Sequence, residues 1–373
     1  AEKRKLLGLT LPSDNIASTS ILADITTAYD FTDHYIGFID AQKIAATFID
    51  GPAGLDIALF GAMDDEPPAM SAVCKEEVRE VVAIMPRMVF GYDEISDEAM
   101  SGTFVFELRQ DIANGLMPIS ALVPGLGVDA GGLLSMGFSF NLLEIRKFYE
   151  SRLDAMEKDP YECEYFAELQ AGVAKGREVL NQPVPPMVYS LRGFNAVIDD
   201  IGDFDLANNQ PPEDIDASVV FAMDDAQTLV AMGAMFSPEL ANLNLQPDGK
   251  AILLDLAQVK ATGKDVYAAM IEDAVAISVG ADAEDRVTAV LAADSASPAP
   301  VFSMSMDAGR YYSLIGETMV LEQDDEAAEL SLEAREALRD AMMAIGELYD
   351  RMAVDLRFTP RGAEFESSVT LKD

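Results

Sequence analysis

The sequence contains no tryptophan, two cysteines and one histidine among 373 residues. A single imidazole excludes the zinc and iron sites that several histidines build, and it leaves His34 as the sole imidazole base for a Ser–His–Asp triad. His34 lies between Asp33 and Tyr35 in a polar stretch. We therefore interpret it as a loop residue that bonds to Asp33 or to the backbone, and we expect no histidine-based chemistry. The lack of tryptophan also counts against a sugar-stacking cleft.

Basic residues are scarce, because 26 Lys and Arg stand against 65 Asp and Glu, for a formal net charge of −39. A field of this sign repels nucleic acid and anionic membrane surfaces. We therefore expect no nucleic-acid partner. An acidic composition is also typical of proteins from saline surroundings, so the charge does not by itself identify a ligand.

Long apolar runs are missing as well, since none approaches the ~20 residues that a membrane-spanning helix requires. The chain begins at Ala1 and continues with the basic residues Lys3, Arg4 and Lys5. This beginning is typical of a mature chain from which a signal peptide has been removed. We expect a soluble protein that is periplasmic or secreted, and an arbitrary cut of the chain is the alternative.

The two cysteines, Cys74 and Cys163, each precede or open a predicted helix. Matching settings and an even number favour one disulfide in an oxidising compartment. Such a bond would close a loop of about 90 residues and stabilise the fold by roughly 4–5 kcal/mol in the chain-entropy description. Two separate buried thiols are the alternative.

Motifs of familiar enzymes are also missing. The sequence has no Gly-x-Ser-x-Gly turn, no phosphate-binding Walker loop and no Cys-x-x-Cys pair, and the glycine-rich residues 125–132 precede a predicted strand instead of a helix. The acids Asp199, Asp203 and Asp205 alternate around a glycine, a pattern whose oxygens suit calcium. A solvated acidic loop is the alternative, so we expect no cofactor unless calcium binds there.

The length exceeds what one hydrophobic core serves, so we expect two lobes. A proline-rich segment at residues 183–186 is the natural linker, which gives an N-terminal lobe of residues 1–182 and a C-terminal lobe of residues 187–373. A strand–helix–turn order recurs at an offset near 115 residues, which indicates internal duplication. Coincidence of similar patterns is the alternative.

Hydrophobic periodicity predicts the elements along the chain. Residues up to about 32 read as irregular and residues 266–268 as part of a helix. The segment 331–352 carries an apolar helical stripe, and residues 354–371 alternate as a hairpin with one buried face. Further strands are predicted at residues 35–39, 88–91, 103–107 and 133–140, and further helices at 41–49, 74–84, 142–156 and 164–180. The predicted class is therefore α+β, with helices packed on antiparallel sheets in two lobes.

Nineteen methionines and many phenylalanines on the predicted strands favour a pliable apolar interior. By alternation, nine side chains should point inward and line a pocket for a greasy ligand, although an ordinary filled core would use the same residues. These candidates are Phe90, Phe106, Met136, Phe138, Phe140, Phe221, Met223, Leu253 and Phe302.

The scarcity of reactive side chains favours binding over catalysis. Our first hypothesis is an exported, non-catalytic binding protein, a carrier of an apolar or lipid-like ligand. The second is a structural or protein-interaction module of the cell envelope, whose acidic, calcium-stabilised surface engages another protein. The third is a hydrolase that uses two carboxylates.

Overall fold

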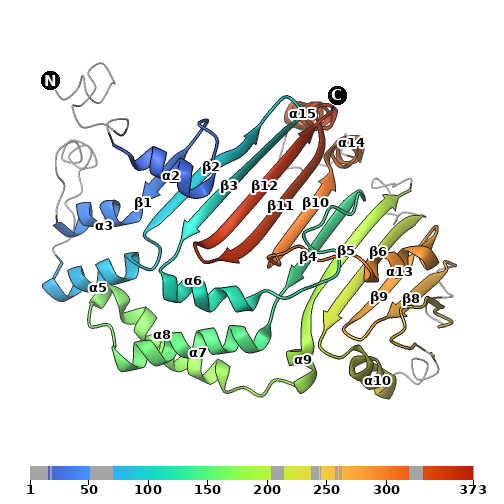
Figure 1. Cartoon of the computed structure of the whole chain (residues 1–373), viewed down its shortest axis with the longest axis horizontal. Helices are drawn as coiled ribbons and strands as arrows, with labels where there is room; N and C mark the ends of the chain where they lie inside the picture. Colours follow the sequence, from blue (N-terminus) through green and yellow to red (C-terminus); the bar gives the residue numbers. More distant parts are fainter. Residues whose placement is uncertain are drawn as a thin grey trace.

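The computed structural model describes residues 16, 19–50, 70–202, 214–236, 243, 245–256, 259, 263–318 and 331–372. Its strands form one antiparallel twelve-stranded sheet, which Figure 1 shows face-on with helices around it. This arrangement confirms the predicted α+β class. From one edge to the other, the strands are β1 (Gly37–Asp40), β2 (Arg87–Ile95), β3 (Ala99–Glu107), β12 (Gly362–Leu371), β11 (Tyr349–Thr359), β10 (Phe302–Asp307), β4 (Leu134–Ser139), β5 (Leu191–Ile201), β6 (Ile215–Met223), β9 (Ala274–Val279), β8 (Val266–Met270) and β7 (Ile252–Leu253).

Both halves of the chain contribute to this sheet, because the C-terminal strands β10–β12 lie between β3 and β4. The proline-rich segment proposed as a linker runs from the end of α8 (Ala167–Leu180) through α9 (Pro186–Ser190) into β5. Division into two lobes and internal duplication stay predictions.

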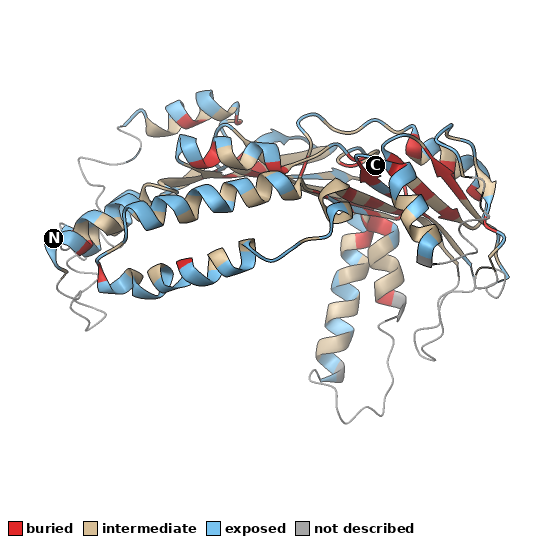
Figure 2. Ribbon diagram, turned by 90° about the horizontal axis from the view of Figure 1, so that it is seen from below, coloured by how far each residue is buried: buried red, intermediate tan, exposed pale blue. Residues whose placement is uncertain are grey.

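The remaining helices lie along the sheet and at its ends. They are α2 (Ile21–Tyr29), α3 (Ala41–Asp50), α5 (Ala72–Val82), α6 (Gln110–Leu116), η2 (Met117–Ile119), α7 (Leu142–Lys158), η3 (Glu164–Phe166), α10 (Ala226–Phe236), α13 (Ala283–Leu291), α14 (Ala308–Thr318) and α15 (Leu332–Leu348). Figure 2 shows the sheet edge-on, with α14 and α15 projecting away from it as a helical hairpin. Among the described residues, no helix is both long enough and apolar enough to cross a bilayer.

The two faces of the sheet differ in what covers them. On one face, α2 packs against Val89 of β2, and α13 packs against Val220 of β6 and Ala276 of β9. Between these two helices the same face carries serine, threonine, glutamate and aspartate, so we call it the polar face. The opposite face carries a row of phenylalanines, described below, and we call it the aromatic face.

Most predicted elements are present, with three corrections. Residues 21–29 form helix α2 instead of irregular chain, since Ile25 is buried against Phe31 and Val89. Residues 266–270 form strand β8 instead of a helix, because they pair with β9. The C-terminal helix α15 ends at Leu348, since Tyr349 already has the extended backbone of β11.

The predicted disulfide is confirmed. Cys74 in the first turn of α5 and Cys163 just before η3 are joined, with Cα atoms 4.7 Å apart and 89 residues between them in sequence. Glu77 of α5 reinforces this link, since its carboxylate accepts hydrogen bonds from the backbone N–H groups of Glu162 and Cys163. The disulfide therefore ties the start of α8 to α5.

Candidate functional site

A row of apolar side chains crosses the aromatic face from β2 to β8. Strand register places each member opposite the next, because paired residues of antiparallel strands point to the same face. In order across the sheet, the row consists of Phe90, Phe104, Phe365, Leu356, Phe302, Phe138, Phe194, Phe221, Val275 and Met270.

Neighbouring rings of the row are in contact. Phe138 lies 5.0 Å from Phe302 and 5.7 Å from Phe194 between ring centroids, and Phe90 stacks on Phe104 at 5.9 Å. A second row beside the first contains Met304, which pairs with Met136. The face is thus a continuous aromatic and methionine surface.

Much of this surface is open to solvent. Phe90 is 38% exposed, Phe138 39%, Phe221 39% and Phe365 38%, whereas Val89 and Val220 on the opposite face are 0% and 1% exposed. Near the far end of the row, α10 packs with Met223 and Met270. Phenylalanine is normally buried, so this exposure requires an explanation.

The C-terminal hairpin of β11 and β12 shows most clearly that apolar side chains are exposed where the sequence predicts them to be buried. Sequence predicted that its apolar residues, such as Leu356 and Phe365, form the buried face. The structure reverses this near the turn, where Phe365 is 38% exposed and its charged neighbour Glu364 is 2% exposed, whereas Leu356 is half-buried. Glu364 tolerates burial because the Arg361 guanidinium donates two hydrogen bonds of 2.7 Å to its carboxylate.

The nine predicted pocket residues are divided by this arrangement. Phe90, Phe138, Phe221 and Phe302 lie in the aromatic row, with Met136 in the next row and Phe106 within ring contact of Phe104. Met223 is buried at the end of β6 under α10, Phe140 follows the end of β4, and Leu253 is 49% exposed on the distant strand β7.

Alternation therefore predicted a shared face for most of these residues, but the inward orientation was wrong for the exposed ones. The prediction missed Phe104, Phe194 and Phe365, which complete the row. For Phe194 and Phe365 a signal was present in the sequence, because each lies between small or polar residues in its strand.

One hollow lies on the aromatic face near β2 and β3. It has a volume of about 240 Å³, and its lining includes Tyr35, Phe90, Phe104, Val354 and Phe365. It is smaller than the range of about 300–1,000 Å³ that encloses most drug-sized ligands. Among the described residues, the aromatic face therefore offers an extended surface that contains this shallow depression.

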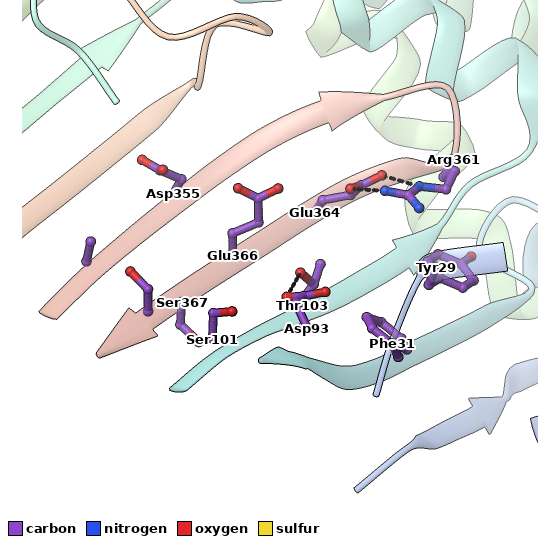
Figure 3. Close-up of a pocket in the computed structure, with 12 residues that line it drawn as sticks. Tyr29, Phe31, Asp93, Ser101, Thr103, Asp355, Arg361, Glu364, Glu366 and Ser367 are labelled. Carbon is purple, nitrogen blue, oxygen red and sulfur yellow. Dashed lines mark hydrogen bonds and ion pairs between the residues drawn. The ribbon is translucent and has the colours of Figure 1, made fainter. Parts of the chain in front are cut away.

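A second, polar cavity of about 380 Å³ lies on the polar face between α2 and the C-terminal hairpin. Figure 3 shows the side chains that line it. Its acidic members are Asp93, Asp355, Glu364 and Glu366, and hydroxyl groups come from Tyr29, Ser101, Thr103, Ser367 and Ser368.

The carboxylates of this cavity have partners. The Thr103 hydroxyl donates to Asp93 at 2.9 Å, Arg361 pairs with Glu364, and Arg357 pairs with both Asp355 and Glu366. The exception is Asp355 Oδ1, which is buried and accepts no hydrogen bond within the described residues. Two guanidinium groups thus serve three of the four carboxylates, and a neutral hydroxyl serves the fourth.

Tyr29 closes one end of this network. Its hydroxyl donates to Glu107, which also accepts hydrogen bonds from Arg87, and Arg361 lies 4.8 Å from its ring centroid. Burial, and then the bond to Glu107, raise the pKa of Tyr29 well above its ordinary value. The neutral phenol is therefore the form that this site holds.

Of the predicted calcium ligands, only Asp199 lies within the described residues, since Asp203 and Asp205 fall outside them. Arg286 Nε lies 2.7 Å from Asp199 Oδ2, and that oxygen accepts no hydrogen bond from any described group. Burial raises the pKa of Asp199, although the charge of Arg286 opposes the shift. In the part of the chain that the structure covers, no three His, Cys, Asp or Glu side chains form a group able to hold a metal ion.

His34 lies exposed in the loop between α2 and β1, where its backbone N–H donates to the Thr32 hydroxyl at 3.4 Å.

The exposed aromatic face is the most unusual feature of the described residues. No known protein-family model, curated protein or solved structure matches this chain.

Proposed function

We propose that this chain is a non-catalytic binding protein whose aromatic face holds the acyl chains of a lipid-like ligand. The observation that carries the proposal is the row of phenylalanines paired from strand to strand, of which Phe90, Phe138, Phe221 and Phe365 remain more than one third exposed. We propose further that the protein acts outside the cytoplasm, because an oxidising compartment accords with its disulfide.

The size of the exposed surface supports this function. At about 200 Å² for a phenylalanine, four rings exposed by close to two fifths present about 300 Å² together. The methionines and aliphatic side chains of the neighbouring rows add to that area. Contiguous apolar patches of several hundred Å² mark interaction sites on soluble proteins.

The chemistry of the face favours flexible hydrocarbon. The aromatic row contains no charged residue, and Met136 and Met304 beside it have polarisable side chains that adapt to irregular shapes. A second copy of the chain is a less favourable occupant, because each copy carries a net charge of −39 and two copies repel each other.

Binding of a neutral apolar dye tests the proposal. Lipid is first removed from the purified protein, and N-phenyl-1-naphthylamine fluorescence is then titrated for the wild type, Phe138→Glu and Phe221→Glu. We expect a carboxylate in the row to weaken dye binding about tenfold or more, because it brings an unpaired charge under the ligand.

Leu122→Glu is the matched control, since Leu122 is 67% exposed and precedes the sheet strand β4 in a loop. It should bind the dye like the wild type. Equal binding by all four proteins would refute the proposal. A stable dimer in light scattering that both Phe variants dissociate would instead support the protein-interaction hypothesis.

A further inference from the structure

An open groove of about 630 Å³ lies between helices α7 and α8, away from the aromatic row. Figure 1 shows the two helices side by side beyond the ends of the strands, and Figure 2 shows them as two separate rods. The groove is larger than the hollow on the aromatic face and falls within the range of about 300–1,000 Å³ found for small-molecule sites.

Helical spacing explains the apolar lining. Leu142, Ile145, Tyr149 and Leu153 recur every three or four residues along α7, so they form one stripe that faces the groove. On α8 the corresponding positions are Gly172, Lys175, Gly176, Val179 and Leu180, and the following residues Pro183 and Val184 close one end. The side chains of this stripe are not buried against the rest of the protein, since α7 has no buried residue and the one buried residue of α8 is Val173.

The two glycines on α8 differ in what surrounds them. A Cβ atom at Gly176 would lie 3.1 Å from Leu153, so glycine there allows the helices to approach. A Cβ atom at Gly172 would meet no atom within 4 Å. Glycine in a helix interior is less favourable than alanine by about 1 kcal/mol, and packing provides no reason for it at position 172. Its effect is to leave the groove open.

The charge of the groove contrasts with that of the whole chain. Its lining contains Arg146 and Lys175 and no acidic residue, although acids outnumber bases by 65 to 26 in the sequence. Arg146 is engaged with the Leu180 carbonyl and the Tyr189 ring. The nearby acids Asp154 and Glu157 share the guanidinium group of Arg177.

Lys175 is therefore the cation available to a ligand. It is exposed and pairs with no carboxylate among the described residues. An ammonium group beside a narrow apolar groove complements a molecule with one acyl chain and one anionic end.

We propose that the α7–α8 groove binds a long-chain fatty acid, with its carboxylate at Lys175 and its hydrocarbon along Leu142, Ile145 and Val179. This site is separate from the aromatic face and does not require that face to bind anything. The distance from Gly172 to Leu180 along α8 is about 12 Å at 1.5 Å per residue, so the groove accommodates a substantial part of one extended chain.

Calorimetric titration of the delipidated protein with oleate and with oleyl alcohol tests the site. The variant Gly172→Leu narrows the groove one turn from Lys175, and we expect it to weaken the oleate binding that depends on Lys175 while thermal stability stays equal or rises, since leucine favours the helix. Lys175→Gln should weaken oleate binding about 3- to 10-fold and leave oleyl alcohol binding unchanged, because only the carboxylate interacts with the ammonium group.

Two control variants distinguish the groove from binding elsewhere on the surface. Lys147→Gln removes a lysine of α7 that pairs with Glu144 outside the groove, and it should bind oleate normally. Phe138→Glu should also keep the part of the oleate binding that depends on Lys175, whatever it does to the neutral dye. Unchanged oleate affinity in Gly172→Leu and Lys175→Gln overturns the assignment, as does loss of oleate binding in Phe138→Glu alone.

Discussion

Removal of the disulfide should destabilise the protein strongly. The perturbation is the double variant Cys74→Ser, Cys163→Ser, which replaces two side chains that are each 3% exposed. The bond spans 89 residues of sequence. The chain-entropy relation gives about 3 kcal/mol for a 15-residue loop and about 4.7 for a 100-residue loop, so we expect a loss of about 4.5 kcal/mol at 25 °C.

The position of the disulfide determines which part of the protein loses stability. Without it, α7 and α8 are attached to the rest of the protein by few contacts, such as the packing of Phe148 on Gly115 and the ion pair of Arg152 with Asp111. Since α7 has no buried residue and α8 has only Val173, the pair should open locally before the sheet unfolds.

Two measurements check this prediction. Urea unfolding followed by circular dichroism gives the free energy of unfolding, since the chain has no tryptophan to report by fluorescence. Hydrogen exchange should show faster amide exchange in α8 than in β3. Ser71→Ala is the control, because it removes only the N-cap hydrogen bond to the Cys74 N–H and should lower stability by about 1 kcal/mol. A loss below about 1 kcal/mol in the double serine variant, with α8 exchange unchanged, would refute the reasoning.

Two further predictions concern the polar face. Glu364→Gln should lower the free energy of unfolding by about 2 kcal/mol in urea titrations, because it leaves Arg361 without its carboxylate, whereas Glu366→Gln, at a side chain 46% exposed, should lower it by less than about 1. Tyr29 has a pKa raised above its ordinary value of 10.0 in the folded state, so its contribution is complete below pH 10 and is lost as the pH rises further. Tyr29→Phe should therefore reduce the alkaline loss of stability and remove the last-titrating phenol from the tyrosinate absorbance curve; an unchanged curve would contradict the assignment.

Local pattern was enough to predict most elements and the disulfide. Alternation located β11 and β12 and their turn, and the matched settings of Cys74 and Cys163 indicated the bond between them. The predictions failed where tertiary contacts override local preference. Residues 266–270 have a sequence compatible with either element, and pairing with β9 decided for a strand.

The candidate site was predictable in part for a related physical reason. Alternation reports which side chains share a face, and it grouped Phe90, Phe138, Phe221 and Phe302 correctly. It does not report which face other elements cover. On the hairpin, that outcome depends on pairing, since Arg361 pairs with the buried Glu364 and Arg357 pairs with Asp355. The groove between α7 and α8 was not predicted, because amphipathic patterns identify helices but not how far apart they lie.

The scarcity of cations connects these observations. Because acidic residues outnumber basic ones by more than two to one, there are too few guanidinium and ammonium groups to pair with every carboxylate. Arg87, Arg357 and Arg361 are used in this way on the polar face, where burial of an unpaired carboxylate would be strongly unfavourable. Strand alternation places the phenylalanines on the other face, where several of them are exposed. Lys175 differs in its surroundings, since it lines an apolar groove whose lining contains no carboxylate. That position beside hydrocarbon side chains is what suits it to an anionic ligand with an apolar chain.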